Sequence, residues 1–211
     1  ILVDSDYSTK IDEMKSILKI LNFNYNDNDL NILTERIYDQ SNVTEFLSNK
    51  ENFILFHFDE KWIYEQYLKS YIPIEPNSYL DLINFLEKIA NKTNNNLIIS
   101  SGNRSNKFID NFKNDFTEIN KNIYNFNNNK IFFLNNLSMK QLELVISKCT
   151  TFVSCHGTPT HIAGAFNKKI IDIIDVSEKL FFVKWSSHFR KYEQLHRFEF
   201  SKLSEIILSK I

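Results

Sequence analysis

The chain has 211 residues, of which 43% are hydrophobic and 24% charged, and Lys plus Arg number 25 against 26 for Asp plus Glu. This composition argues against intrinsic disorder, and a net charge of −1 provides no basic surface for duplex DNA or an anionic membrane. No apolar run approaches the roughly 20 residues of a membrane-spanning helix, and the start ILVDSDYSTK lacks the pattern of a secretory leader. We therefore expect a cytoplasmic protein in which Cys149 and Cys155 are free thiols.

Glycine and proline are scarce, with three residues of each. Asparagine, which tolerates left-handed backbone conformations, must therefore build many of the turns, and we expect loop tips at the Asn tracts 94–96 and 127–129. The same scarcity makes the position of each glycine informative. Gly157 and Gly164 flank one motif, and Gly102 follows an apolar strand pattern.

The first 50 residues differ in texture from the rest. Apolar residues from Ile11 to Leu21 recur at the i, i+3, i+4, i+7 spacing of an amphipathic helix, and a second short helix is expected around 43–47. We interpret 1–50 as a helical connector or the remnant of an amino-terminal domain, and 51–211 as one α/β domain.

From residue 52 onward, short apolar runs alternate with helical patterns. Strands are expected at 53–56, 97–99, 131–134, 151–153 and 170–174, and helices at 78–91, around 108–112, from Ser138 onward, and at 159–166, 186–192 and 201–210. Continuous apolar runs are typical of strands buried on both faces, and helices between them imply parallel crossovers. The fold class is therefore α/β, a Rossmann-like, doubly wound parallel sheet of about five or more strands with helices on both faces.

Ligands bind such sheets at the carboxyl ends of the strands. The most informative segment there runs from Ser154 to Ala165, where Thr158 is a suitable N-cap, Pro159 a suitable first helical residue, and Gly157 permits a tight turn. Free amides at such a helix start bind phosphate, and His161 lies in the first turn. Alternatively, the segment is only a well-capped helix start with small residues that pack closely on the sheet.

Two further segments follow predicted strands. Lys61, beside Trp62, could meet a phosphate as a point charge, although surface charge next to a core aromatic is the commoner meaning of such a pair. Ser101, Gly102 and Asn103 could reach a ribose or a base, or Gly102 could simply end the strand.

Other polar residues receive structural interpretations. Cys155 beside His156 makes a poor thiolate pair, because neighbours on a strand point to opposite faces, and with His161 it lacks the spacing of a zinc site. Asp172 and Asp175 are interpreted as sheet-end residues or helix caps. In the terminal segment we expect packed aromatics at Trp185, Phe189, Tyr192 and Phe198 and solvated side chains at His188, Arg190, His196 and Arg197.

These segments together resemble the carboxyl-terminal half of glycosyltransferase family 9, the heptosyltransferase-like enzymes of lipopolysaccharide assembly with the GT-B fold. The stretch from Cys155 to Ala165 resembles the family motif Asp-Ser/Thr-Gly-x-x-His-(Leu/Ile)-Ala-(Ala/Gly)-Ala, and 137–149 is similar to the preceding helix. Lys61-Trp62 resembles the Lys-Trp after the first strand, and 7–23 the connector into the second domain. The chain departs from the motif at Cys155 and His156, and by one extra residue before His161.

The resemblance implies a nucleotide-sugar-binding domain over 51–211. Lys61, Gly157, Thr158 and His161 would bind the donor diphosphate; Ser101, Gly102 and Asn103 would lie by the nucleoside; His57 and His156 are further expected contacts to substrate. No metal or cofactor is expected, and the catalytic base would belong to an amino-terminal domain or partner chain outside these residues.

The function that the resemblance implies is transfer of a sugar from a nucleoside-diphosphate donor to a saccharide or lipid-linked saccharide acceptor in cell-surface polysaccharide or lipopolysaccharide assembly. Such an enzyme would be cytoplasmic, or peripheral to the inner face of the membrane, and would not bind nucleic acid. The alternative is a non-catalytic Rossmann-like binding or assembly module, because a fold by itself does not decide function.

Overall fold

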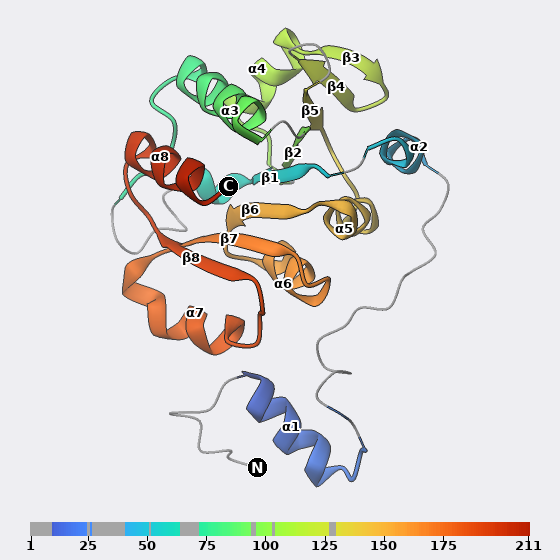
Figure 1. The fold of residues 1–211 in the computed structure, drawn as a ribbon, viewed down its shortest axis with the longest axis vertical. Helices are drawn as coiled ribbons and strands as arrows, with labels where there is room; N and C mark the ends of the chain where they lie inside the picture. The colour runs from blue at the N-terminus through green and yellow to red at the C-terminus, as the bar shows by residue number, and fades with distance from the viewer. Residues whose placement is uncertain are drawn as a thin grey trace.

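The computed structural model describes residues 10–24, 26, 41–50, 52–63, 72–93, 96–102, 104–126 and 130–211 (Figure 1). The helices are α1 (Lys10–Ile20), α2 (Asn42–Ser48), α3 (Tyr79–Thr93), α4 (Lys107–Asp115), α5 (Met139–Lys148), α6 (Thr158–Ala165), α7 (Lys179–Ser186) and α8 (Phe200–Lys210), with 3-10 turns η1 (Glu60–Trp62) and η3 (Val176–Glu178). The strands are β1 (Ile54–Phe58), β2 (Leu97–Ser101), β3 (Thr117–Asn120), β4 (Ile123–Phe126), β5 (Ile131–Leu134), β6 (Thr151–Cys155), β7 (Lys169–Ile174) and β8 (Tyr192–His196).

The eight strands form one sheet in the order β3-β4-β5-β2-β1-β6-β7-β8. All pairings from β5 to β8 are parallel, while β3 and β4 form an antiparallel hairpin at one edge. The first strand, β1, lies in the middle of the sheet; the strands β2 to β5 fill one side of it, and β6 to β8 then fill the other. This arrangement is the doubly wound, Rossmann-like α/β fold that the alternation of strands and helices predicts.

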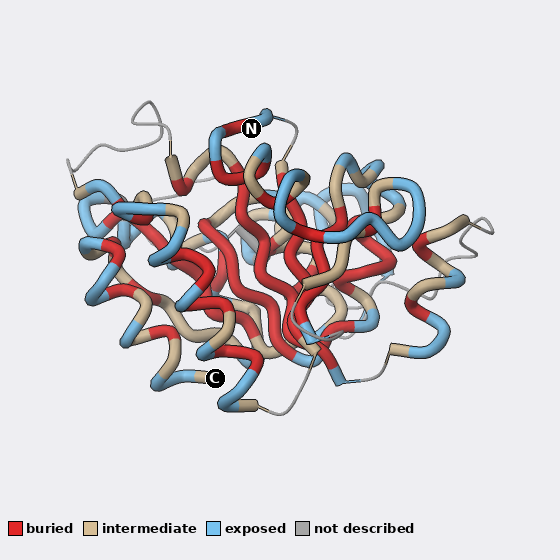
Figure 2. The backbone as a smooth tube through the Cα atoms, turned by 90° about the horizontal axis from the view of Figure 1, so that it is seen from above, coloured by how far each residue is buried: buried red, intermediate tan, exposed pale blue. Residues whose placement is uncertain are grey.

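Two hydrophobic cores lie on opposite faces of the sheet. Alternate residues along β1 divide between them: Phe56 and Phe58 pack with α3, α4 and α8, whereas Leu55, and Phe53 just before the strand, pack with α2, α5 and α6. Figure 2 shows the result, a central set of fully buried strands between partly exposed helices. Burial on both faces explains why these strands are apolar runs rather than alternating patterns.

Most predicted elements are confirmed, with shifts of a few residues at their ends. The capping box of α5 is present: Ser138 Oγ accepts from Gln141 N and Gln141 Oε1 accepts from Ser138 N. Asparagine builds left-handed turns, since φ is positive at Asn22, Asn52, Asn122, Asn136 and Asn167. Of the two Asn tracts, 94–95 and 127–129 lie outside the described residues.

Two predictions about elements need correction. The helix expected at 186–192 is wrong: α7 ends at Ser186, and Tyr192 begins β8, which pairs with β7 from Ile170 onward. The edge position of β8 leaves it only partly buried, so its sequence lacks an apolar run. The hairpin β3-β4 was not expected, because all four residues of β3 are exposed and give no hydrophobic signal.

The helix α1 confirms the amphipathic pattern at 11–21 and lies beside α7 (Figure 1). Its apolar side chains remain largely in solvent, with Met14 48% and Ile17 51% exposed. The expected domain boundary near residue 50 stays a prediction. Among the described helices, none combines the length and apolarity required to cross a bilayer.

Candidate functional site

Three neighbouring central strands bring the predicted site segments together where they end. We call the line of these carboxyl ends the carboxyl edge of the sheet, and 'this edge' below refers to it. β1 lies between β2 and β6, and all three run parallel. The segments that follow are η1 after β1, Gly102 after β2, and His156 with Gly157 before α6. Residues about 40 and 100 positions apart along the chain thus share one edge, as the carboxyl-end rule requires.

Asp59 organises the turn η1 that carries Lys61. Its Oδ1 accepts from the backbone N of Lys61 at 3.1 Å, and its Oδ2 accepts from Lys61 Nζ at 2.7 Å. Partial burial lowers the pKa of Lys61, but the adjacent Asp59 carboxylate outweighs that effect, and the net shift is upward. Lys61 therefore stays an ammonium ion, held in a fixed position at the sheet edge.

Lys61 lies against Gly157, and Glu60 lies against Gly102. A Cβ built on Gly157 would be 2.6 Å from Lys61 Nζ, and one built on Gly102 would collide with Glu60 Oε2. The turn η1 thus sits between two glycines. For Gly157 the expected reason was a tight turn, but φ is 175° and ψ is −170°, which any residue can adopt. What a side chain at residue 157 would displace is the flexible end of Lys61, which approaches Gly157 closely.

The start of α6 differs from the prediction by one residue. Gly157, not Thr158, is the N-cap, so Thr158 and Pro159 occupy the first two helical positions. The reason is Thr160, whose hydroxyl accepts from Gly157 N at 3.2 Å and so caps the turn from inside the helix. Pro159 has no N–H, and the amides of Thr160 and His161 donate to the carbonyl of Gly157. The amide of the exposed Thr158 is therefore the one that this turn could offer to an anion.

His156 and His161 both lie at this edge, in different surroundings. His156 Nδ1 is 2.6 Å from Oδ2 of Asp172, which is fully buried on β7. His161 instead packs edge-on against three rings, those of His156, Trp185 and Phe189. Burial and the neighbouring His156 lower the pKa of His161 to about 4. His161 is therefore neutral at pH 7 and could offer a phosphate one hydrogen bond but no charge.

The residues predicted near the nucleoside and the substrate lie deeper. His57 and Ser101 belong to the ends of β1 and β2, where they are 4% and 8% exposed. His57 Nδ1 is 2.9 Å from Ser100 Oγ, and burial lowers the pKa of the His57 imidazole. Asn103 lies outside the described residues. Direct substrate contact by His57 and Ser101 stays a prediction. In the structure both side chains are buried within the ends of their strands.

Arg197 is a site residue that the sequence did not reveal. It was expected in solvent, but it is 5% exposed, and both terminal nitrogens donate to the carbonyl of Lys61 at 3.2 Å. Arg197 directly follows β8, so recognition of that strand would have placed it at the carboxyl edge. The Arg197 guanidinium thus holds the backbone of η1 at Lys61, the residue whose side chain lies against Gly157.

The cysteines and Asp175 agree with their structural interpretations, but Asp172 does not: it lies inside β7, neither at the sheet end nor as a helix cap, and its buried carboxylate bonds the side chains of His156 and Tyr192. Cys149 and Cys155 are free and buried, and burial raises the pKa of both thiols, that of Cys149 to about 12. Asp175 caps η3 by accepting from Ser177 N. Within the described ranges, no three His, Cys, Asp or Glu side chains are grouped to hold a metal ion. Gly164, expected to allow packing on the sheet, instead meets the ring of Phe189.

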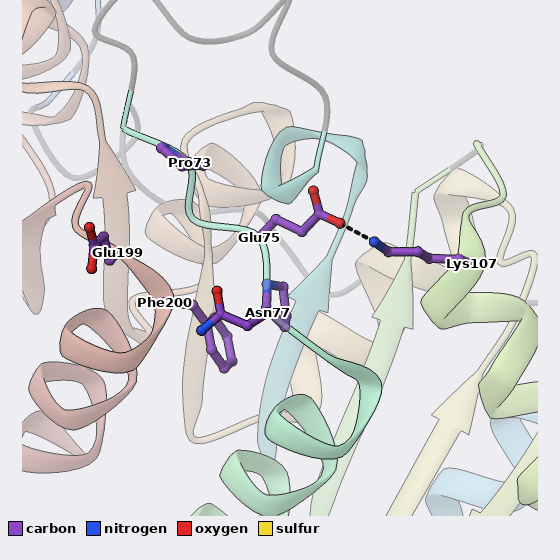
Figure 3. A pocket seen from close by; sticks show the side chains of 7 residues that line it. Pro73, Glu75, Asn77, Lys107, Glu199 and Phe200 are labelled. Atoms are coloured by element: carbon purple, nitrogen blue, oxygen red, sulfur yellow. Dashed lines mark ion pairs between the residues drawn. The ribbon is translucent and has the colours of Figure 1, made fainter.

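A cavity of about 430 Å³ opens elsewhere on the domain, and none of the site residues predicted from the sequence lines it (Figure 3). Its lining comes from the segments that enter α3, α4 and α8: Pro73, Glu75, Pro76, Asn77, Lys107, Glu199 and Phe200. Glu75 and Lys107 form an ion pair of 2.5 Å across it. The cavity and the Lys61–Gly157 contact are thus built from different residues of the carboxyl-end loops.

No protein-family model matches the chain, and no curated protein matches it. Among solved structures, it is similar to the UDP-GlcNAc 2-epimerase of Methanocaldococcus jannaschii in complex with UDP-GlcNAc and UDP. That likeness has a TM-score of 0.50 at 12% identity and covers 80% of this chain and 41% of the epimerase chain. The ADP-heptose heptosyltransferase II of E. coli gives 0.47 at 9% identity, covering 84% and 54%. The chain thus spans less than two thirds of either protein, and the likeness to the epimerase supports the Rossmann-like fold.

Proposed function

We propose that this chain binds the diphosphate of a nucleotide sugar and is the donor-binding domain of a glycosyltransferase. One observation carries the proposal: the Lys61 ammonium lies against Gly157 at the start of α6, where a side chain on residue 157 would collide with it. A fixed cation beside the amino-terminal end of a helix is an arrangement that favours phosphate groups.

The chemistry of sugar transfer needs such a site. When the bond between the sugar and the diphosphate breaks, negative charge accumulates on the departing phosphate oxygen. Fixed donors stabilise that charge without reorganising during the reaction. Lys61 would supply the charge and the Thr158 amide at the start of α6 a backbone donor, so that neither a metal ion nor a cofactor is needed. The catalytic base would come from an amino-terminal domain or a partner chain that completes the cleft.

The proposed substrate class rests on the motif resemblance to glycosyltransferase family 9. Its supporting residues, Lys61 and the segment from Gly157 to His161, come from separate segments and lie at the same edge of the sheet. The fold likeness agrees with a nucleotide-sugar site, since the epimerase was solved with UDP-GlcNAc and UDP. A saccharide or lipid-linked acceptor in cell-surface polysaccharide or lipopolysaccharide assembly follows from the family resemblance alone.

A second candidate is a non-catalytic binding or assembly module. The observation that favours it is the surface of α7, where Leu180 is 81%, Phe181 54% and Val183 42% exposed. Exposed apolar side chains grouped on one helix are typical of protein-protein contacts. The two candidates differ in one measurable property, because only the first requires saturable binding of a nucleoside diphosphate.

The test is a calorimetric titration of the chain with ADP, GDP and UDP, repeated with Lys61→Gln and a matched control. Lys130→Gln removes the same charge from an exposed lysine that precedes β5, at the opposite edge of the sheet. The proposal predicts that one nucleotide binds, that Lys61→Gln weakens binding roughly 10- to 100-fold, and that Lys130→Gln does not. Equal affinity in the two variants would refute the site, and no binding by the folded chain would favour the module.

A further inference from the structure

The helix α7 carries large apolar side chains on the outside of the domain. Phe182 and Ser186, about one helical turn apart, face inward: the Phe182 ring packs on the His156 ring at 4.6 Å between centroids, and Ser186 is buried. The other faces of the helix expose Leu180, Phe181, Val183 and Trp185. Apart from α1, which contacts α7, no other described helix or strand exposes more than one large apolar residue. The grouping is therefore specific to this part of the molecule.

Basic residues accompany these apolar side chains. The whole chain has a net charge of −1, but the stretch 179–191 contains four basic residues and no Asp or Glu: Lys179, Lys184, Arg190 and Lys191. All of them except Lys184 are exposed. The neighbouring α1 does not reverse this balance, since it carries three lysines against Asp12 and Glu13. The overall charge, which predicted no basic surface, thus conceals a local positive one. We call the exposed side chains of 179–191 the α7 surface.

The α7 surface has the chemistry of a helix that lies on a membrane. Such helices place Leu, Phe and Trp at the boundary between lipid headgroups and acyl chains, and Lys and Arg against anionic headgroups. Protein interfaces also use aromatic residues, but they are depleted in lysine. Three of the four basic residues here are lysines. The charge and the apolar side chains together are therefore complementary to an anionic lipid surface rather than to a protein.

We propose that the α7 surface docks the protein on an anionic lipid bilayer, with Leu180 and Phe181 inserted at the headgroup boundary. The helix would lie in the plane of the membrane, because its 8 residues are far fewer than the roughly 20 that span one. Side chains of α7 contact the rings of His156 and His161, so docking would hold the proposed diphosphate site beside the lipid. The inference goes beyond the proposed function and does not require nucleotide binding.

The first experiment measures co-sedimentation of the full chain with vesicles of phosphatidylcholine alone, or of phosphatidylcholine and phosphatidylglycerol in equal parts. Wild type should bind the mixed vesicles roughly 10-fold or more tightly than the neutral ones, and added salt should weaken that binding by screening. Leu180→Ser should weaken binding to the mixed vesicles roughly 10-fold. Leu80→Ser makes the same change at an exposed leucine of α3 and should bind like wild type.

A second pair of variants tests the charge. Lys179→Gln combined with Lys191→Gln should weaken binding to the mixed vesicles roughly 10-fold and leave binding to neutral vesicles unchanged. The matched control is Lys121→Gln combined with Lys130→Gln, which removes two exposed lysines near β4 and β5. All these side chains lie on the surface, so circular dichroism and Tm should match wild type.

The two tryptophans report which surface meets the lipid. Trp62 is 1% exposed, whereas Trp185 lies on α7. Lipids with brominated acyl chains should quench part of the tryptophan emission, and Trp185→Phe should abolish the quenching. The inference is overturned if wild type binds neither vesicle, if Leu180→Ser and Leu80→Ser bind alike, or if brominated lipids quench nothing.

A protein occupant would give a different result. Self-association of the folded chain that Leu180→Ser abolishes, without any vesicle binding, would assign the α7 surface to a second copy and overturn the inference. Nucleotide titrations are made without lipid, so the proposed function stands or fails separately. A chain that binds vesicles through α7 and no nucleotide would keep this inference and refute the diphosphate site.

Discussion

Nζ of Lys61 and the α-carbon of Gly157 are so close that a methyl group on Gly157 would lie 2.6 Å from that nitrogen. The Asp59 carboxylate lies 2.7 Å from the same Nζ, and the Arg197 guanidinium donates to the backbone carbonyl of Lys61. Both the ammonium group and the backbone of Lys61 are therefore held in place, beside the start of α6. This relationship joins two segments that the sequence separates by nearly a hundred residues.

Gly157→Ala should weaken nucleotide binding with little loss of stability. The backbone at Gly157 is extended and tolerates alanine, so the new methyl group displaces the flexible end of Lys61 instead of straining the turn. We expect about a 10-fold loss of affinity and a change in unfolding free energy below about 1 kcal/mol. Combined with Lys61→Gln, the alanine should add nothing further; additive losses would show that Gly157 acts independently of Lys61.

Gly164→Ala should have the opposite profile. A Cβ there would be 2.8 Å from Cζ of Phe189 and closer still to two other ring atoms. Overpacking against an aromatic ring costs about 1–3 kcal/mol, which exceeds the roughly 1 kcal/mol that alanine contributes to a helix. Thermal unfolding should show a lower Tm, restored by Phe189→Leu. A variant more stable than wild type would contradict the contact.

His161 should make the protein less stable in mild acid. Burial lowers its folded pKa to about 4, whereas the unfolded chain titrates near 6.5. Between these values the unfolded state binds the proton, so stability is complete above about pH 6.5 and falls as the pH approaches 4. His161→Phe keeps the ring packing and removes this titration. Its Tm relative to wild type should rise as the pH falls from 7 to 4.5; parallel Tm curves would exclude the effect.

Both cysteines should be unreactive in the folded protein. Cys149 and Cys155 are each 1% exposed, and burial raises both thiol pKa values, so little thiolate exists at pH 8. A chromogenic disulfide reagent should label neither thiol until denaturant is added, and then both. Rapid labelling of one thiol in the native state would contradict their burial and reopen a chemical role for Cys155.

Local signals in the sequence predicted most of the fold. The apolar run at β1 and the Ser138–Gln141 capping box depend only on neighbouring residues, and both are confirmed. The parallel arrangement also predicted that the segments of Lys61 and Gly157 meet at one edge. The cause of the glycine was not predictable, because it depends on where another segment places its side chain.

The missed features depend on contacts between distant residues. Tyr192 looked helical because β8 becomes a strand only by pairing with β7. Arg197 looked solvated because its acceptor, the carbonyl of Lys61, is 136 residues away. The pair of His156 and Asp172 arises from the register of β6 and β7, in which Ser154 lies opposite Asp172. Register between parallel strands leaves no mark on either strand's own sequence.

The central claim is that a nucleoside diphosphate binds beside Gly157, and glycine scarcity allows a direct test. The chain has three glycines, so a ¹⁵N-glycine-labelled sample gives a simple amide spectrum that glycine-to-alanine variants can assign. Gly102 and Gly157 lie at the proposed edge, while Gly164 lies against Phe189. Titration with ADP, GDP and UDP should shift the Gly157 signal most, with saturation by one nucleotide and little change at Gly164. Saturable binding that leaves Gly157 unmoved, or no shift with any nucleotide, would contradict the account.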